Sequence, residues 1–524
     1  MFVKKAVPAI LVFLILLGVF FLYFTFPQKK ADFSIALIGE QRTVDPALTT
    51  TLEEGRIVRA LFEGLVYLDS KTLKPRPGAA KTWEVSEDGL CYRFHLRHSR
   101  WSDGSPVTAG DFVYSWRRIL EPDFISQYDY MLFYLKNAEN YRKKLITNFS
   151  EVGVEAPDDT TLIVTLAHPT AYFLDIVGFE TLFPVNRACV EKYGIQWSRP
   201  EHIVTNGAYT LTFHQLNYKM RLEKSGTYWD TARAHFKIID AYTCEGVNTA
   251  FNMYETGDVG LLDDIPNIIA EELLKRPDMF NYLCFGTYFY RMNVTRPPFS
   301  DVRVRRAFEM AINKEEIVKY VTKSGEAAAS TLVPPGIDGY PKVKGAPYNP
   351  DSARALLKAA GFPGGKGLGE VELIYNTSEN HKKIAEAIAY MLKKELGVNI
   401  LPLNVEWKVL LSRQEKLDYA FSRGSWYGDY TDPNTFLDMF VTGGGNNNTG
   451  WSDRAYDSLI ILAGRTLDPK TRFSFLAQAE QIMMDQGPLI NIYYYTAKFL
   501  LKPDIRGFYP NLRSYYHLAD MYRE

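Results

Sequence analysis

The sequence predicts an α/β protein of two or three domains, and three observations support this prediction. The chain has 524 residues, more than a single hydrophobic core usually organises. From Asp32 onward, segments with the two-residue period of strands alternate with segments at helical spacing. Between Val371 and Val405 a strand, a helix and a second strand follow one another directly. That order is typical of parallel strands joined by a crossover helix.

The first residues have the pattern of a membrane segment. Two lysines precede an uncharged apolar run over residues 6–26, and about twenty apolar residues span a bilayer as a helix. The run ends without the small residues that signal peptidase needs, and no cysteine that could carry a lipid precedes Cys91. We therefore expect residues 1–31 to be an uncleaved N-terminal anchor rather than a removed signal, with the rest of the chain exported.

Regular structure is predicted at several places in the first half. Apolar residues alternate as in a strand over residues 33–37, 92–96 and 162–166, and they recur at helical spacing over residues 57–68. Thr108 and Asp111 have the spacing of a capping box, which predicts that a helix begins there.

The second half has a clearer α/β pattern. Asn349-Pro350 supplies an N-cap residue and a first-turn proline, and Gly361 follows the predicted helix. The glycine- and asparagine-rich run 443–448 is expected to be a flexible loop. The other predicted elements are strands at Val371–Tyr375, Val398–Val405, Lys416–Ser422 and around Tyr493–Tyr495, and helices at Lys382–Leu396 and Arg454–Ala463.

No catalytic or metal-binding motif is present. The chain has no nucleophile elbow, no P-loop and no His-Glu-x-x-His, and its eight histidines are scattered singly. A net charge of −1 with a pI near 6.7 gives no basic surface for nucleic acid. We therefore expect no enzyme, no cofactor, no metal and no nucleic-acid partner.

The four cysteines leave two alternatives open. Cys91, Cys189, Cys244 and Cys284 lie far apart, without the spacing of a zinc site. Outside the cytoplasm they could form up to two disulfides, or they could be isolated buried thiols.

A group of charged and aromatic residues follows the second of the two crossover strands. It comprises Trp407, Arg413, Arg423, Trp426, Asp429 and Asp432. Because ligands of α/β domains usually bind beyond the ends of strands, these are candidate binding residues. The alternative is structural, with Arg423 and Asp429 as a salt bridge and Trp426 in a core.

At these residues the chain resembles the periplasmic oligopeptide-binding proteins, the receptors of peptide ABC importers. The similarity extends along nearly all of the chain after the apolar run, and both the order and the spacing of its motifs agree with the family. The matching segments are Asp45-Pro46, Leu61–Leu65, Trp101–Ala109, Asp111–Trp116, Val204–Tyr209, Pro297–Phe299, Asp301–Arg305 and Tyr375–Ser378.

This resemblance implies a bilobed periplasmic-binding-protein fold with an extra domain, which encloses its ligand between the lobes by hinge closure. The first lobe would comprise residues 32–62, 186–283 and 497–524, and the extra domain beside it residues 63–185. The second lobe would comprise residues 284–496.

The resemblance also implies a set of peptide-binding residues. Asp429 matches the family's aspartate that pairs with the free α-amino group of the peptide. The other family cleft positions are Trp426, Arg423, Trp407 and His381, together with Asn376, Tyr128 and Arg413.

Three departures from the family pattern stand out. An acidic residue near the amine end of the family's ligand is Thr50 here, although Glu53 and Glu54 are close. A family cysteine is Tyr427, so the disulfide that would involve Cys284 is expected to be absent. The uncleaved anchor implies a receptor tethered near its importer rather than one that diffuses freely.

The resemblance therefore implies a monomeric extracytoplasmic receptor that captures short peptides and delivers them to a membrane permease. The same fold could instead bind a metal chelate, haem or an oligosaccharide. A membrane-anchored peptidase and a signalling ectodomain that acts through a partner are two further hypotheses, from different functional classes.

Overall fold

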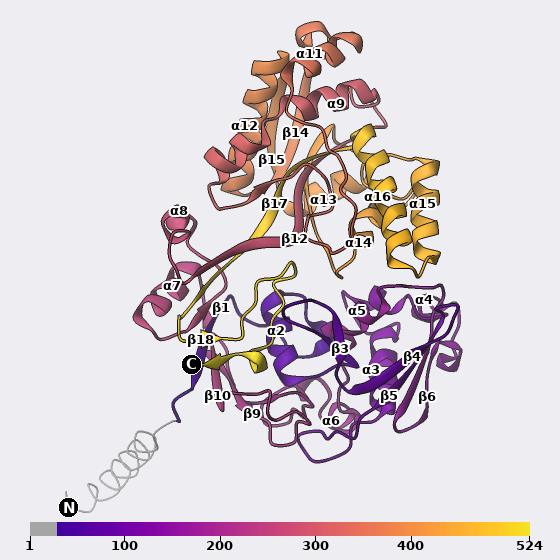
Figure 1. The fold of residues 1–524 in the computed structure, drawn as a ribbon, viewed down its shortest axis with the longest axis vertical. Helices are drawn as coiled ribbons and strands as arrows, with labels where there is room; N and C mark the ends of the chain where they lie inside the picture. Colours follow the sequence, from indigo (N-terminus) through magenta and orange to yellow (C-terminus); the bar gives the residue numbers. More distant parts are fainter. Residues whose placement is uncertain (1–28) are drawn as a thin grey trace, which may run out of the picture.

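Two lobes joined by a pair of long strands make up the protein (Figure 1). The computed structural model describes residues 29–524. Strands β12 (Met279–Met292) and β17 (Leu489–Leu501) pair antiparallel and extend from one lobe into the other. They belong to one sheet of eleven strands with the order β15-β14-β16-β12-β17-β11-β1-β10-β9-β8, in which β13 also pairs with β17. The predicted bilobed α/β fold is confirmed.

The expected N-terminal anchor falls almost entirely on residues 1–28, which lie outside the described residues. Within residues 29–524, no helix combines the length and the apolar composition needed to cross a bilayer.

The N-terminal lobe contains β1 to β11, β18 and β19. Strand β1 (Phe33–Ile38) lies parallel to β10 (Ile238–Cys244) and to β11 (Leu261–Leu262). Its predicted apolar face is confirmed, because Phe33, Ile35 and Leu37 are all buried. The end of the chain returns to this lobe, where Phe499, Tyr516 and Met521 pack in the same core as Phe33.

A separate antiparallel sheet, β4-β5-β7-β6, lies at the far side of the N-terminal lobe. Helix α3 (Ala109–Leu120) packs on it, and the predicted capping box is present between Thr108 and Asp111. The helix predicted over residues 57–68 is only partly right, because α2 ends at Leu61. The chain then turns into β2, where the carbonyl of Leu65 accepts hydrogen bonds from the amides of Gly78 and Ala80.

The C-terminal lobe contains β13 to β16 and helices α9 to α16. Strand β14 (Glu370–Asn376) is parallel to β15 (Asn399–Val405), and helix α12 (Glu379–Leu396) connects them as predicted. Strand β16 (Phe421–Tyr427) begins later than the predicted Lys416, because helix α13 (Trp407–Glu415) precedes it and residues 416–420 form the connecting turn.

The remaining strands and helices complete the two lobes. The other strands are β2 (Val66–Leu68), β3 (Pro75–Pro77), β4 (Ala80–Val85), β5 (Cys91–Leu96), β6 (Val154–Asp158), β7 (Thr161–Thr165), β8 (Tyr209–Gln215), β9 (Lys219–Lys224), β13 (Ala327–Ala328), β18 (Ile505–Arg506) and β19 (Tyr522–Arg523). The other α-helices are α2 (Leu52–Leu61), α4 (Ala138–Arg142), α5 (Phe173–Val177), α6 (Arg187–Tyr193), α7 (Val247–Thr256), α8 (Ala270–Leu273), α9 (Val302–Ala311), α10 (Lys314–Glu316), α11 (Pro350–Ala359), α14 (Asn434–Leu437), α15 (Arg454–Arg465) and α16 (Pro469–Gln486).

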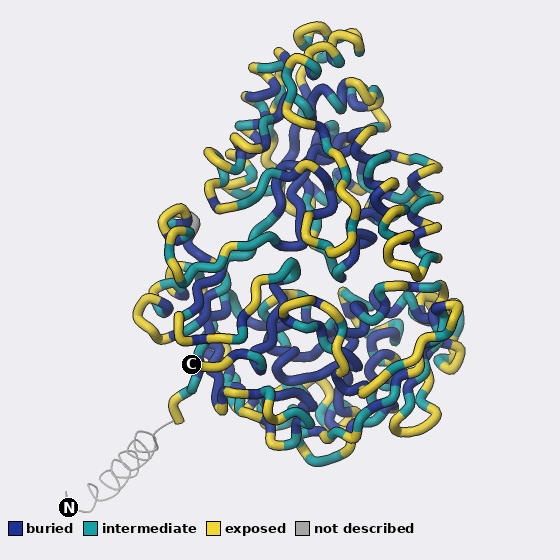
Figure 2. The backbone as a smooth tube through the Cα atoms, viewed as in Figure 1, coloured by how far each residue is buried: buried dark blue, intermediate teal, exposed yellow. Residues whose placement is uncertain are grey.

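Where the crossing strands leave the N-terminal lobe, most of their residues are intermediate in burial (Figure 2). The pairing of β12 with β17 is irregular between Leu283 and Thr287, and β12 changes there from half-buried to fully buried residues. Each lobe has a hydrophobic core of its own. The crossing strands are therefore the natural place for one lobe to turn against the other.

All four cysteines are free thiols. Cys284 lies on β12, with its Sγ 3.6 Å from Ser514 Oγ. The sequence allows either disulfides or isolated thiols, and the structure has isolated thiols.

Candidate functional site

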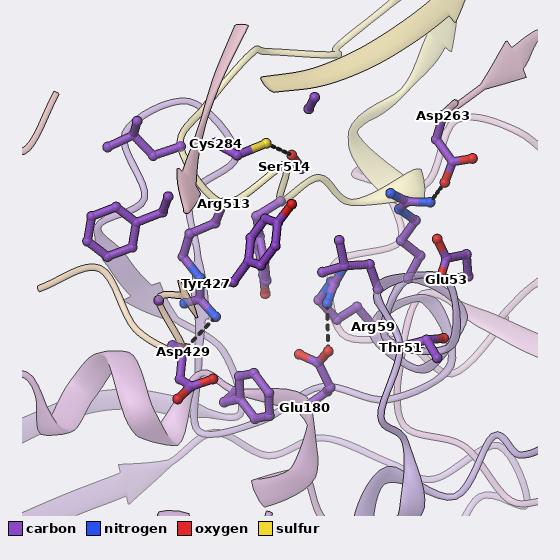
Figure 3. Close-up of a pocket in the computed structure, with 18 of the residues that line it drawn as sticks. Thr51, Glu53, Arg59, Glu180, Asp263, Cys284, Tyr427, Asp429, Arg513 and Ser514 are labelled. Atoms are coloured by element: carbon purple, nitrogen blue, oxygen red, sulfur yellow. Dashed lines mark hydrogen bonds and ion pairs between the residues drawn. The ribbon is translucent and has the colours of Figure 1, made fainter. Parts of the chain in front are cut away.

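A pocket of about 420 Å³ lies between the two lobes, next to the crossing strands (Figure 3). Helix α2 and the preceding loop form one side, and the loop after β16 forms another. The lining residues from the N-terminal lobe and the chain's last segment are Thr49–Glu53, Arg56, Arg59, Tyr128, Phe179, Glu180, Asp263, Asp264 and Leu512–Tyr515. Strands β12, β16 and β17 and the loop after β16 contribute Cys284, Phe285, Tyr427–Asp429 and Thr496–Phe499.

Hydrogen bonds to its backbone hold Asp429 in this pocket. The amide of Asp429 donates to Thr435 Oγ1 at 3.2 Å, and Arg513 Nη2 donates to the carbonyl of Asp429 at 2.8 Å. The preceding residue must be glycine, because a Cβ at Gly428 would lie 2.3 Å from the ring of Phe285. The loop therefore approaches β12 closely and holds Asp429 at one end of the pocket (Figure 3).

The carboxylate of Asp429 has no cationic partner among the described residues. Its side chain accepts one hydrogen bond, from Tyr130 Oη at 3.2 Å. Arg513 binds the backbone of Asp429 and pairs instead with Asp175, at 3.4 Å. Burial raises the pKa of Asp429, and the bond from Tyr130 and the charge of Arg513 oppose that rise. The pocket thus contains a partly desolvated carboxylate that a cationic group would stabilise.

An aromatic wall lies beside Asp429. The ring of Tyr128 is 5.1 Å from that of Phe179 and 5.9 Å from that of Tyr130. Burial, with a smaller contribution from the charge of Asp429, raises the pKa of Tyr128 to about 12. Tyr128 is therefore neutral at physiological pH, and it offers an apolar face and a hydroxyl to a ligand.

Most other charges in the pocket are paired. Arg59 Nη1 lies 3.0 Å from Glu180 Oε1, and Arg56 pairs with Asp263. Of the two glutamates near Thr50, Glu53 lines the pocket, whereas Glu54 accepts hydrogen bonds from the backbone amides of residues 42 and 50. Glu53 therefore places an acidic group in the pocket lining close to Thr50.

The C-terminal lobe contains a buried cationic side chain, that of Arg423. Arg423 is buried, and its Nη2 donates to Tyr495 Oη at 3.1 Å while the guanidinium lies 4.8 Å from the ring centre of Tyr288. No carboxylate pairs with it among the described residues. His381 Nδ1 lies 3.3 Å from Tyr288 Oη, and burial together with the charge of Arg423 lowers the pKa of His381 to about 4.

The remaining predicted residues lie at one edge of the sheet. Asn376 ends β14, Trp407 begins α13 directly after β15, and Trp426 is near the end of β16. Because β14, β15 and β16 are parallel, these ends meet at the same edge. Arg413 differs, because its guanidinium is held by Glu372 at 2.5 Å and by the carbonyl of Asp418 at 2.8 Å, further from this edge.

Three residues at this site are not indicated by any motif in the sequence. Arg513 and Lys498 line the pocket and come from the last part of the chain, whereas Tyr130 reaches the pocket through its hydrogen bond to Asp429. Tyr427 was noted only as a missing cysteine, yet its ring stacks on that of Tyr495 at 4.6 Å and covers Gly286. Among residues 29–524, no three His, Cys, Asp or Glu side chains are placed to hold a metal ion.

Comparisons with known proteins agree with this architecture. The family model "Bacterial extracellular solute-binding proteins, family 5 Middle" matches residues 74–448. The dipeptide-binding protein DppE of Bacillus subtilis is 36% identical over 479 residues, covering 90% of this chain and 88% of that protein. The periplasmic oligopeptide-binding protein OppA of Salmonella typhimurium is 35% identical over 486 residues, covering 90% and 88%.

A solved structure is similar over nearly the whole chain. The murein tripeptide binding protein MppA, in its unliganded open form, superposes with a TM-score of 0.85 at 32% identity, covering 95% of this chain and 98% of that one. The lobes of the present structure are thus arranged much as in an open, empty protein of this architecture.

Proposed function

The chain belongs to the bacterial extracellular solute-binding proteins of family 5, and we propose that it captures short peptides between its lobes and delivers them to the permease of an ABC importer. Its relatives DppE and OppA are described as dipeptide-binding and oligopeptide-binding. Members of this family bind solutes rather than transform them, so the protein is not an enzyme.

The carboxylate of Asp429 is the observation that carries the proposal of a peptide ligand. It is partly desolvated, lacks a cation among the described residues and sits at one end of a pocket between two lobes. A peptide's α-ammonium group provides the missing charge, and closure of the lobes excludes water from the pair and strengthens it. A sugar or a neutral chelate would leave this carboxylate unpaired.

Arg423 supplies the opposite charge for the other end of the peptide. It is buried without a carboxylate partner in the described part of the chain, its Nη2 donates to Tyr495 Oη, and its charge acts on His381. The α-carboxylate of a short peptide offsets this charge. Between the two ends, the backbone groups of an extended peptide can pair with protein backbone, which makes binding largely independent of sequence.

Closure of the cleft couples binding to transport. The peptide contacts both lobes, so it favours the closed form by the difference between its affinities for the two forms. The proposed moving units are a first lobe (residues 32–62, 186–283 and 497–524) with its extra domain (63–185), and a second lobe (284–496). The permease then recognises the closed, loaded form.

The protein acts outside the cytoplasm, as its periplasmic relatives do. We propose that it is a monomer and that the apolar run over residues 6–26 tethers it to the cytoplasmic membrane. The tether is tested by washing membranes at alkaline pH and locating the full-length protein. Recovery of intact chain in the soluble fraction would disprove the tether without affecting the peptide proposal.

Peptide binding is tested on full-length protein purified in mild detergent. After gentle unfolding, released small molecules are identified by mass spectrometry, and the emptied, refolded protein is titrated by calorimetry with tri-alanine and with N-acetyl-tri-alanine. We expect released short peptides, and we expect acetylation to weaken binding by at least about tenfold.

Asp429→Asn should abolish the difference between free and acetylated peptide. Equal binding of both peptides to the unaltered protein would show that Asp429 has a structural role. Release of a chelate, haem or sugar, with no peptide binding, would refute the peptide proposal and leave the family assignment intact.

A further inference from the structure

Arg291, on strand β12, is a buried arginine without a counter-charge among the described residues. Six arginines of the described chain are buried, and Arg291 is 7% exposed. Three of the six, Arg56, Arg59 and Arg472, pair with carboxylates, and Arg305 donates to three backbone carbonyls. Arg423 is the residue that we propose pairs with the α-carboxylate of the peptide.

The side chain of Arg291 makes only one hydrogen bond to a described residue, from its Nη1 to Gln414 Oε1 at 3.2 Å. Its Nε is buried and has no partner in the described part of the chain. Burial lowers the pKa of Arg291; the nearby Tyr419 opposes this effect, and the charge of Arg423 adds to it. Besides Arg423, the groups that face Arg291 are aromatic or neutral, with the ring of Phe289 5.1 Å away. The described residues therefore do not compensate this charge.

The side chain of Arg291 leans toward the cleft edge of the sheet. Arg291 is paired with Ser422 of β16, and the next residues of β16 on the same face are Gly424 and Trp426. A Cβ at Gly424 would lie 3.1 Å from Arg291 Nη1, so the guanidinium occupies the space above that glycine.

The same face of β16 carries a second buried hydrogen-bond donor without a partner. Trp426 Nε1 is buried and has no hydrogen-bond partner in the described structure. Two buried donors, Arg291 Nε and Trp426 Nε1, thus belong to one sheet face, with the Phe289–Gly424 pair between their positions. Asp429, which we propose binds the peptide's amine, follows Trp426 by three residues.

Helix α13 covers the same face. Gln414, near its end, holds both Arg291 and the β16 backbone, with Gln414 Nε2 2.8 Å from the carbonyl of Arg423. Trp407, at its start, is two turns away on the same side of the helix and is 48% exposed at the cleft edge. Trp407 and Trp426 therefore lie on the cleft-edge side of Arg291.

We propose that Arg291, flanked by Trp407 and Trp426, forms a subsite that selects peptides carrying an acidic side chain. This inference rests on the proposed peptide-binding function and adds a substrate class to it. An isolated buried cation is unfavourable, and a ligand carboxylate that accepts hydrogen bonds from it removes that penalty on binding. A glutamine of the same shape makes the contacts but leaves the charge unpaired.

The inference is tested with three pairs of tripeptides, in which one position of tri-alanine is Glu in one peptide and Gln in the other. Each is titrated calorimetrically into peptide-free, full-length protein, and into Arg291→Met, Arg291→Lys and Arg354→Met. Arg354 is an exposed arginine of the same lobe, paired with Asp351 and Glu395. Arg354→Met therefore changes the net charge by the same amount as Arg291→Met.

At one peptide position we expect Glu to bind at least about tenfold more tightly than Gln. That preference should disappear in Arg291→Met, persist in part in Arg291→Lys and remain unchanged in Arg354→Met. Cooperative unfolding of Arg291→Met shows that this variant is folded.

The outcomes separate this inference from the function on which it rests. Equal binding of Glu and Gln peptides at all three positions overturns the acidic subsite but leaves peptide binding established. If Arg291→Met weakens all peptides equally, Arg291 pairs with the α-carboxylate instead of a side chain, which also overturns the inference. If no peptide binds to the unaltered protein, the proposed function fails, and the subsite fails with it.

Discussion

Tyr130 and Asp429 are separated by 299 positions in the sequence, yet Tyr130 Oη donates a hydrogen bond to Asp429 Oδ2 at 3.2 Å. Tyr130 belongs to the N-terminal lobe and Asp429 to the loop after β16. Close by, the rings of Tyr172 and Tyr430 stack at 4.3 Å, also between the two lobes. The two lobes are thus in contact at one side of the cleft, where the ammonium group is proposed to bind.

Removing the Tyr130 hydroxyl should weaken peptide binding and change its pH dependence. The hydroxyl stabilises the charged form of Asp429 and lowers its pKa, and the peptide's ammonium needs that charged form. In Tyr130→Phe the pKa of Asp429 should rise, so affinity should be lost at a higher pH as the solution is acidified. At neutral pH we expect roughly three- to tenfold weaker binding.

Calorimetric titrations across the acidic and neutral range measure both effects of Tyr130→Phe. Tyr320→Phe is the matched control, because Tyr320 is 60% exposed on the C-terminal lobe. An unchanged pH profile in Tyr130→Phe would mean that the bond does not influence Asp429.

Asp429→Asn should stabilise the empty protein while impairing its function. Burial raises the pKa of Asp429 above its ordinary value, so the ionised form destabilises the folded state at neutral pH. A neutral amide removes that penalty, which we expect to be worth up to about 1 kcal/mol. Below the ordinary pKa the aspartate is protonated in both folded and unfolded chains, so the gain should vanish there.

Urea unfolding of peptide-free protein at neutral and strongly acidic pH measures this gain. Asp123→Asn, whose side chain is 95% exposed, should show no comparable gain. A loss of stability in Asp429→Asn at neutral pH would contradict the prediction.

His381 should remain neutral throughout the physiological range. Burial and the charge of Arg423 lower its pKa to about 4, so peptide affinity should show no step from this residue near its ordinary pKa of about 6.5. NMR of labelled histidine, assigned with His381→Gln, follows the titration directly. Arg423→Met should move the midpoint upward, and a midpoint already near the ordinary value would refute the prediction.

The buried pair of Asp432 and Arg472 should contribute strongly to stability. Arg472 Nη2 donates to Asp432 Oδ1 at 2.9 Å, and Nη1 contacts the second carboxylate oxygen. Asp432→Ala leaves a buried cation unpaired and should lower the free energy of unfolding by about 3–5 kcal/mol. Denaturant unfolding measures the change.

The exposed pair of Asp351 and Arg354 is the control, and Asp351→Ala should cost less than about 1 kcal/mol. The double variant with Asp432→Leu and Arg472→Met should be more stable than Asp432→Ala, because no charge then remains unpaired. If Asp432→Ala lowered the free energy of unfolding as little as Asp351→Ala does, the buried pair would not contribute strongly to stability.

Local patterns in the sequence predicted much of the fold. The alternation at Phe33, Ile35 and Leu37 and the capping box at Thr108 depend on neighbouring residues, and both are present in the structure. The helix predicted over residues 57–68 failed at its end, because the chain there pairs with β3, Pro75–Pro77, in a local hairpin. Leu65 and Leu68 fit a helical period by spacing alone, and the hairpin pairing decides their structure.

The site was predicted to a smaller extent than the fold. Asp429 and Tyr128 both line the pocket, and Trp407, Trp426, Asn376 and His381 lie toward one edge of the C-terminal sheet. Their roles remain predictions. Tyr130, Arg513 and the unpaired charge of Arg291 depend on which segments meet in three dimensions, and no spacing of residue types along the chain reveals that.

The packing of Phe499, Tyr516 and Met521 against Phe33 also has a consequence for biosynthesis. The N-terminal lobe cannot complete its core until these late residues have been made. At about 5–20 residues per second, that takes tens of seconds after β1 has left the ribosome. A chain that cannot finish folding early stays suitable for threading through a translocon, so the return of the C-terminus to the first lobe keeps the protein competent for export while it is being synthesised.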